Sequence, residues 1–351
     1  TTTTTTTTTT TGTTTTTTTR LQRTRFRKRV ISGRDKEKVR PTEEVIALAM
    51  KAIQDCQREN LIPADRIFSV DETGIWFGAG FKHKYMKKDN SESNRATDSA
   101  DERSRITEMA ALSATGETLP GYTIVKCTSN KADLTGTTVL NTLLKDLNAK
   151  DPSCVWEKHI WEREISILPK KKKDSAQQPA KLIKFRRPYL RSTSTGSIVT
   201  CQHKAWMDRV GIMMWGDTVM KPYVQENGGT NLPWQIIWDN CSTHAGEEIK
   251  KVFREYGIYL CFLPANMTDL FQILDLLWNG IAKAFLRKER CIPIYLSLSR
   301  YVAVNAGQPE IEAFVPPVPT IALTVQLLEK FRRVTLTLTL TLILTLTLIL
   351  T

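Results

Sequence analysis

The stretch from Gln235 to His244 constrains the fold most, because it joins a short apolar run to an abrupt polar end. The run stops at Asp239, which is followed by Asn240 and, five residues after the acid, by His244. An apolar run of this length bounded by polar residues predicts a buried strand. Many α/β proteins place ligand-binding groups where such strands end. We therefore expect Asp239 at the end of a strand, with Asn240 and His244 just beyond it.

Two further stretches each carry one acid inside an apolar pattern. Residues 66–74 predict a strand that bears Asp71. Residues 270–277 predict an amphipathic helix that bears Asp275. An acid within an apolar run costs free energy unless it has a partner or a purpose. Each acid alone is also consistent with a turn, a helix cap or a surface position.

Three carboxylates that meet at one point suit phosphodiester cleavage. Two Mg²⁺ ions about 3.5–4 Å apart can stabilise the attacking and the leaving oxygen in such a reaction. Mg²⁺ prefers hard oxygen ligands and takes one or two carboxylates of its own. We expect Asp71, Asp239 and Asp275 to be the catalytic, metal-binding residues, with Mg²⁺ or Mn²⁺ as cofactor.

The other elements predict an α/β protein. Helical periodicity runs through residues 41–60 and 245–256, and a buried strand is expected at 258–263. Two strands around Gly116 predict a hairpin over residues 105–127. Residues 140–200 follow no clear pattern, and we expect an insertion outside the core sheet with low order.

The net charge of +13 is concentrated in two segments. Residues 20–40 contain ten Lys or Arg and two acids, and residues 170–191 contain nine and one. Such segments suit phosphate binding, although a solvated basic surface is the alternative. The first segment also suits nuclear import, so a nuclear location is expected. The candidate nucleic-acid contacts are Arg23, Arg25, Arg27, Lys28, Arg29, Arg186 and Arg187.

The seven cysteines are scattered and form no CxxC pair. This argues against a disulfide framework or a structural zinc site, and it favours a reducing compartment. Cys201 and His203 alone are too few to form a ligand set.

Both ends of the chain are low in complexity. Residues 1–19 are threonine with a single glycine, which predicts disorder. From Val334 the chain alternates Thr and Leu and is uncharged. Its length allows a membrane span, but the alternation fits a strand better, and no membrane is expected. A short repeated DNA sequence would also encode this dipeptide. The expected organisation is a disordered Thr-rich and basic arm at 1–40, a core at 41–300 with an insertion at about 140–200, and a tail at 301–351.

Three motifs, one around each of Asp71, Asp239 and Asp275, follow one another along the chain. Together they resemble the DDE superfamily endonucleases of the pogo and Tigger-like transposases, over roughly residues 60–130 and 200–290. That family shows an apolar strand followed by Asp-Glu-Thr-Gly, then Asp-Asn-x-x-x-His, then Leu-Pro with a later Thr and Gln-x-Leu-Asp. The matching residues are Val70 to Gly74, Asp239 to His244, Leu263, Pro264, Thr268, and Gln272 to Asp275.

The resemblance implies an RNase H-like fold, a mixed sheet flanked by helices, and a metal-dependent DNA endonuclease or transposase. DNA, bound mainly through its phosphates, is the implied partner, and a homodimer is left open. Asn240 and His244 would orient a ligand or contact the substrate. For His244, a helix-start cap or a core histidine is the alternative. Glu72 is expected to point away, because neighbours on a strand face opposite sides.

The sequence also departs from the family. Ile273 stands where the family commonly has proline, and 168 residues separate Asp71 from Asp239. The family's N-terminal helix-turn-helix modules are not found ahead of the core. A catalytically inactive, transposon-derived nucleic-acid-binding protein is therefore the alternative function.

Overall fold

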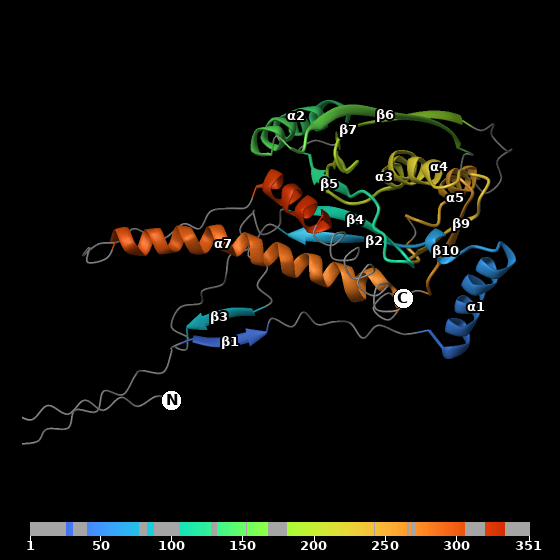
Figure 1. Cartoon of the computed structure of the whole chain (residues 1–351), viewed down its shortest axis with the longest axis horizontal. Helices are drawn as coiled ribbons and strands as arrows, with labels where there is room; N and C mark the ends of the chain where they lie inside the picture. Colours follow the sequence, from blue (N-terminus) through green and yellow to red (C-terminus); the bar gives the residue numbers. More distant parts are fainter. Residues whose placement is uncertain are drawn as a thin grey trace, which may run out of the picture.

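A computed structural model gives the arrangement of the chain (Figure 1). It describes residues 26–30, 41–76, 83–87, 105–127, 132–151, 153–167, 181–241, 243–264, 267, 271–305 and 320–333. The threonine tract, Arg23, Arg25 and the Thr–Leu repeat lie outside these ranges. Within them, the chain builds one eight-stranded sheet with helices packed against it and one separate two-stranded sheet.

The eight-stranded sheet is mixed, as the sequence predicts. The strand order is β10-β9-β2-β4-β5-β8-β7-β6. The pairs β2–β9, β9–β10 and β5–β8 are parallel, and the other pairs are antiparallel. The strands are β2 (Ile67–Trp76), β4 (Arg105–Ser113), β5 (Tyr122–Lys126), β6 (Trp156–Ile167), β7 (Lys181–Ser192), β8 (Ile198–Gln202), β9 (Trp234–Trp238) and β10 (Ile258–Phe262). The small sheet pairs β1 (Phe26–Val30) with β3 (His83–Lys87).

Helices cover both faces of this sheet. One face, which carries Phe68 and Val70, packs against the helical turns of residues 209–226 and against α5. The opposite face, which carries Ala110, packs against η4, the start of α7 and a helix over residues 321–333. The bounds are α1 (Glu43–Glu59), η1 (Ala64–Arg66), α2 (Ala132–Lys150), α3 (Arg209–Trp215), η3 (Gly216–Met220), α4 (Lys221–Glu226), α5 (Glu247–Glu255), η4 (Leu274–Trp278) and α7 (Asn279–Asn305).

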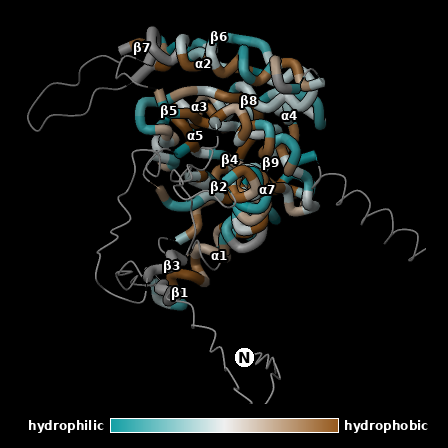
Figure 2. The backbone as a smooth tube through the Cα atoms, turned by 90° about the vertical axis from the view of Figure 1, so that its left-hand side faces the viewer, coloured by the Kyte–Doolittle hydropathy of each residue, from teal (hydrophilic) through white to brown (hydrophobic). Residues whose placement is uncertain are grey.

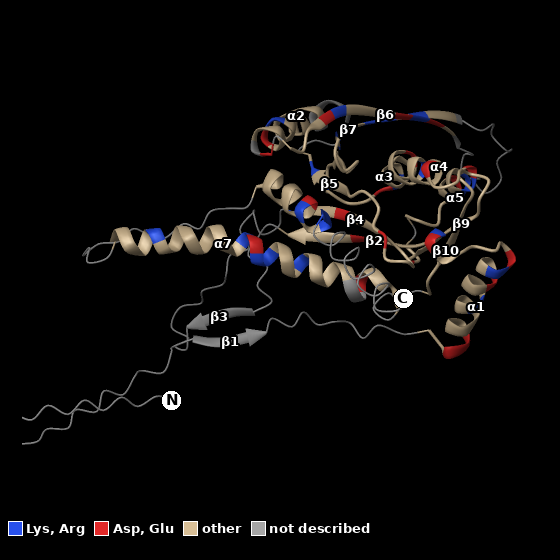
Figure 3. Cartoon of the chain, in the orientation of Figure 1, with Lys and Arg blue, Asp and Glu red and all other residues tan. Residues whose placement is uncertain are grey.

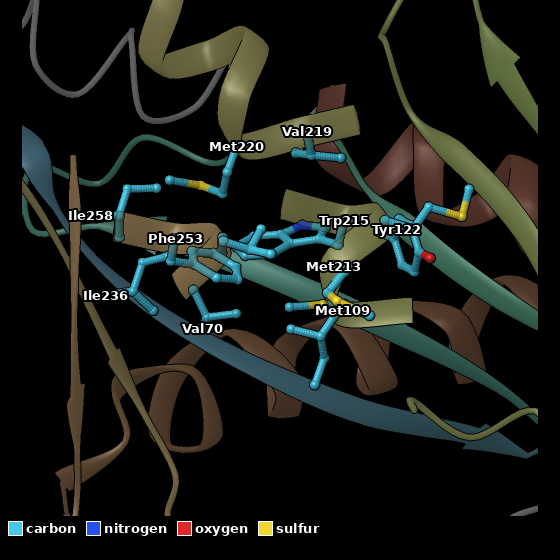
Figure 4. Packing of buried hydrophobic residues seen from close by; sticks show 14 of the residues in the cluster. Val70, Met109, Tyr122, Met213, Trp215, Val219, Met220, Ile236, Phe253 and Ile258 are labelled. Atoms are coloured by element: carbon cyan, nitrogen blue, oxygen red, sulfur yellow. The ribbon is translucent and has the colours of Figure 1, made fainter. Parts of the chain in front are cut away.

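The core lies mainly between the sheet and the helical turns of residues 209–226. Trp215 is buried there beside Phe253, with 6.0 Å between the ring centres (Figure 4). The Trp215 ring also lies 5.8 Å from that of Trp238. Hydrophobic segments gather along the central strands β4 and β9 (Figure 2). Central strands with apolar residues on both faces are expected where helices cover a sheet on both sides. This packing fixes the strands that bear the candidate acids.

The helix over residues 321–333 is tied to the sheet by a buried ion-pair network. Arg332 contacts the carboxylates of Glu108 on β4 and Glu329 on its own helix. Thr195 donates to the second oxygen of Glu329 at 2.6 Å. The Arg332 guanidinium lies so close to Gly121 that a Cβ atom there would clash with it. Removing one partner of a buried pair is costly, so this network holds the helix in place.

The expectation of an insertion outside the sheet is wrong for the described part of residues 140–200. These residues supply the end of α2 and the strands β6, β7 and β8, and all three strands belong to the main sheet. The basic side chains of β7 led to the wrong prediction, because the sequence pattern does not show that acids on the neighbouring strand pair with them. Lys184 and Arg186 on β7 both pair with Glu162 on β6. Residues 168–180 lie outside the described ranges.

Two further predictions concern disulfide bonds and membrane-spanning segments. None of the seven cysteines forms a disulfide bond. No helix among the residues that the structure describes is long and apolar enough to cross a membrane.

Candidate functional site

The sheet places two of the predicted acids side by side. β9 pairs with β2 only through Ile67 to Ser69, and β9 ends at Trp238. Asp71 lies two residues beyond the last paired position of β2, and Asp239 directly follows β9. Both acids therefore stand where the two parallel strands separate. This is the position that the apolar run and its abrupt end predict.

Asp71 and Asp275 are joined by one side chain. Asn279 Nδ2 donates to Asp71 Oδ2 at 2.7 Å and to Asp275 Oδ1 at 3.0 Å. Asp71 is buried on β2, whereas Asp275 is exposed on the π-helical turn η4. Gln272 anchors the start of this turn, because its Nε2 donates to the carbonyl of Val70 at 3.0 Å. The helix that carries Asp275 is thus held against the strand that carries Asp71.

The surroundings of Asp71 disfavour its charged form. Burial raises the pKa of Asp71 from an ordinary value near 3.8 to about 8, and the charges of Asp275, Glu72 and Asp239 add to this rise. The hydrogen bond from Asn279 opposes it. Like charges that share a site have this effect because they repel one another. Asp239 and Asp275 are therefore both close enough to Asp71 to act on it electrostatically. Figure 3 marks acidic positions in red, including a stretch of β2.

A second cluster lies on the opposite face of β2. His244 is buried and stacks on Trp238 with 4.3 Å between the rings. Its Nε2 lies 3.0 Å from Glu72 Oε1, and its Nδ1 lies 2.5 Å from Asp239 Oδ1. Burial lowers the pKa of His244, but the bonds to Asp239 and Glu72 outweigh this and raise it to about 10. His244 is thus a cation at neutral pH that orients Asp239.

Glu72 is the residue that the sequence prediction left out of the site. It does face the side opposite Asp71, as strand alternation requires. That side, however, is where His244 lies, so Glu72 points into the cluster around Asp239. Asn279 was also missed as a contact of the acids. The signal for Glu72 was its position beside Asp71 together with a histidine five residues after Asp239.

Two donor sets can be compared as metal sites. The ligating atoms of Glu72, Asp239 and His244 lie within 4.8 Å of one another. Both ring nitrogens of His244 already face carboxylates, so no imidazole lone pair is left for a metal ion. Asp71 and Asp275 are not part of that close group. With Asp239 they offer carboxylate oxygens, and Asn279 Oδ1 is buried beside them without a hydrogen-bond donor among the described residues. Such an oxygen-rich set fits a hard divalent cation better.

The basic candidates fall into three groups. Arg187 is buried and forms a bidentate ion pair with Asp208, at 3.0 and 2.8 Å. Its prediction as a nucleic-acid contact is wrong, because the guanidinium is engaged inside the protein. Arg186 is exposed, with Nε 3.2 Å from Glu162. The side chains of the other candidates, Arg23, Arg25, Arg27, Lys28 and Arg29, lie outside what the structure describes.

The two polar residues after β9 differ in exposure. Asn240 is exposed and therefore open to a ligand. His244 is 2% exposed, so it does not contact a substrate directly. A position that orients Asp239 is the role its geometry allows.

Comparison of the sequence with protein-family profiles and with curated proteins finds no match. The chain is therefore defined by its fold and its site. The fold is mixed α/β, and an acidic cluster surrounds Asp71 on the central strand β2.

Proposed function

We propose that this chain is a divalent-metal-dependent DNA endonuclease core of the DDE transposase type. One observation carries the proposal. Asp71, Asp239 and Asp275 come from β2, the end of β9 and η4, and burial together with the charges of Asp275, Glu72 and Asp239 raises the pKa of Asp71 to about 8. Carboxylates gathered against their own repulsion are typical of sites that a cation completes.

The fold supports the same proposal. A mixed sheet with helices on both faces is what the resemblance implies, and the described strands have that form. The finer assignment, an RNase H-like fold, is part of the proposal. It rests on Asp71 on a central strand, Asp239 after the adjacent parallel strand and Asp275 on a helix packed beneath.

The residues of the site have separate roles in this proposal. Asp71, Asp239 and Asp275 would hold Mg²⁺ or Mn²⁺, which supplies charge stabilisation and an activated water when bound. His244 fixes the direction of Asp239, and Glu72 in turn fixes His244. Asn279 holds Asp71 and Asp275 together. Asn240, exposed beside Asp239, is positioned to contact the DNA. The exposed Arg186 would contribute to phosphate binding.

The test is nicking of supercoiled plasmid DNA in Mg²⁺ or Mn²⁺. Asp71→Asn, Asp239→Asn and Asp275→Asn should each abolish nicking, because each removes a carboxylate from the same site. Asp146→Asn is the matched control, since Asp146 is exposed on α2. It should nick like the unchanged chain. Equal nicking by all four variants would show that another site, or a contaminating nuclease, is responsible.

A second candidate is a nucleic-acid-binding protein that has lost catalysis. One observation favours it: His244 pairs with both Glu72 and Asp239, and its positive charge offsets part of their negative charge. In that case DNA binding would weaken steeply with salt, as phosphate contacts require. Nicking would be absent in both metals, and the three aspartate variants would bind DNA like the unchanged chain.

A further inference from the structure

A second polar site lies at the end of the sheet where β2 ends. It is a hollow of about 310 Å³. No acid is among its lining residues, and two of them are tryptophans. The lining residues are Trp76, Arg105, Lys126, His203, Lys204 and Trp206.

The register of the strands brings these side chains together. Trp76 at the end of β2 stands opposite Arg105 at the start of β4. Lys126 at the end of β5 stands opposite Gln202 at the end of β8. Directly paired residues share a face, so the hollow is built by neighbouring strand ends. Rigid strand ends hold a ligand contact more firmly than loops do.

Arg105 is placed between the two indole rings. Its guanidinium carbon lies 3.7 Å from the ring centre of Trp206 and 5.4 Å from that of Trp76. Its Nε is buried and has no hydrogen-bond partner among the described residues. No ion pair to Arg105 is found within the same ranges. The guanidinium is therefore not paired with a carboxylate among the described residues.

Both tryptophans are open to solvent. Trp76 is 49% exposed and Trp206 is 57% exposed. Aromatic side chains that are this exposed, with Lys126 and Lys204 beside them, are not part of the hydrophobic core. The Arg105 guanidinium covers one face of Trp206, so a flat ring would stack on its other face or on the exposed part of Trp76.

The loop that carries Trp206 is fixed in advance. Gln202 Oε1 accepts hydrogen bonds from the backbone nitrogens of Lys204 and Trp206, at 2.7 and 3.3 Å. Ala205 has a φ of 53°, a left-handed conformation that a residue with a Cβ rarely adopts. The hydroxyl of Thr107 holds it by donating to its carbonyl at 2.5 Å. Strained positions held in this way often present a functional side chain.

We propose that this hollow, the Trp76–Trp206 groove, binds a single-stranded segment of nucleic acid. A base would stack on an indole face, and its phosphates would contact Arg105, Lys126 and Lys204. Stacking on aromatic side chains combined with a cationic track is how single strands are bound without sequence preference. A duplex does not fit this description, because its bases are stacked on one another and closed to the indoles.

The groove lies on the face of β2 that carries Glu72, opposite the face that carries Asp71. Glu72, Gly74 and Trp76 alternate along the strand and so share one face. The span from Glu72 to Trp76 is about 13 Å at the usual rise of a strand. Gly74 between them has no side chain, and the Arg105 guanidinium and the Trp76 indole lie close over it. The assignment of this strand as substrate rests on the proposed function, whereas binding itself does not.

The test measures binding without cleavage. Fluorescence anisotropy with a labelled oligothymidine of about 12 nucleotides is recorded in EDTA, with Asp71→Asn in the background of every protein. Trp206→Ala and Arg105→Ala should each weaken binding by about tenfold, in line with the loss of one stacked base or one cation–phosphate contact. Trp206→Phe should retain most of the affinity, because a ring remains. Tyr295→Ala, an exposed aromatic on α7, and Lys145→Ala, an exposed lysine on α2, are the controls and should not change it.

The competing outcomes are distinct. Equal affinity for a duplex of the same length, or unchanged affinity in Trp206→Ala and Arg105→Ala, would overturn the proposal. If Trp206→Ala does not fold, Trp206→Phe and Lys126→Ala carry the test. Plasmid nicking is measured separately, on proteins that keep Asp71. Absence of nicking by the unchanged chain, with single-strand binding intact, removes only the proposed function. Nicking that persists in Trp206→Ala and Arg105→Ala with unaltered single-strand binding removes only the groove.

Discussion

Asn279 Nδ2 lies 2.7 Å from Asp71 Oδ2 and so joins the first residue of α7 to a central strand of the sheet. The same nitrogen reaches Asp275, which makes Asn279 the link between two carboxylates that repel each other. The Asn279 amide thus bridges Asp71 and Asp275 within the acidic cluster.

Replacing this amide by a carboxylate tests its role. Asn279→Asp should lower the melting temperature in EDTA, because it adds a buried acid to the cluster, at a cost on the order of 1–3 kcal/mol. Mg²⁺ should raise the melting temperature of this variant by more than that of the unchanged chain. Asn141→Asp, an exposed position on α2, is the control. Equal melting temperatures of Asn279→Asp and Asn141→Asp in EDTA would mean that the Asn279 amide does not stabilise the acidic cluster.

The raised pKa of Asp71 predicts how stability depends on pH. The carboxyl keeps its proton in the folded state up to about pH 8, but in the unfolded chain only to near 3.8. Its contribution to stability is therefore complete below about pH 4 and is lost as the pH rises through 8. Between pH 5.5 and 8.5 the metal-free protein should become less stable, and Asp71→Asn should reduce this slope. A difference of one between the pKa values of the folded and unfolded states corresponds to about 1.4 kcal/mol in the free energy of unfolding. Parallel curves for the two proteins would contradict the assignment.

Arg186 and Arg187 are neighbours on β7, but replacing each should lower the stability by a different amount. Arg187→Ala leaves Asp208 without its partner, and Asp208 also caps α3 by accepting from the Gly211 nitrogen at 2.7 Å. The free energy of unfolding should fall by about 3 kcal/mol or more. Arg186→Ala breaks an exposed pair and should cost less than about 1 kcal/mol. Urea titration of the two variants distinguishes them, and equal losses would mean that Arg187 is not structural.

The hairpin of β6 and β7 should be required for folding. Deleting residues 165–195 removes β7, which connects β6 to β8 in the sheet, and cooperative melting should be lost. Replacing only residues 168–180 by a short glycine-rich turn should be tolerated, because Ile167 and Lys181 are paired across the hairpin. A cooperative melt after the larger deletion would show that these strands are dispensable.

Much of the frame around the acids could be predicted because it is encoded locally. The hairpin of β4 and β5, the strands β2 and β9 and the helix α5 each follow from an apolar period and its punctuation. Asp71 and Asp239 could be placed because each lies on, or directly after, such a run. Their position on neighbouring parallel strands then follows from the pairing of β2 with β9.

What could not be predicted depends on pairing between distant segments. Glu72 meets His244 only because β9 and the loop after it lie beside β2. Asn279 reaches Asp71 through a π-helical turn, whose extra residue per turn shifts the periods that a sequence pattern uses. The strands β6 and β7 were hidden by their charges, since Glu162 balances Lys184 and Arg186 only after the strands pair.

The central claim is that Asp71, Asp239 and Asp275 form one cation site. The most direct measurement is the melting temperature as a function of Mg²⁺ concentration for the unchanged chain, the three Asp→Asn variants and Asp146→Asn. Ligands that bind only the folded state stabilise it in proportion to the logarithm of their concentration. The melting temperature of the unchanged chain and of Asp146→Asn should rise with Mg²⁺, and that of the three site variants should not. A rise of the same size in all five proteins, or in none, would contradict the account.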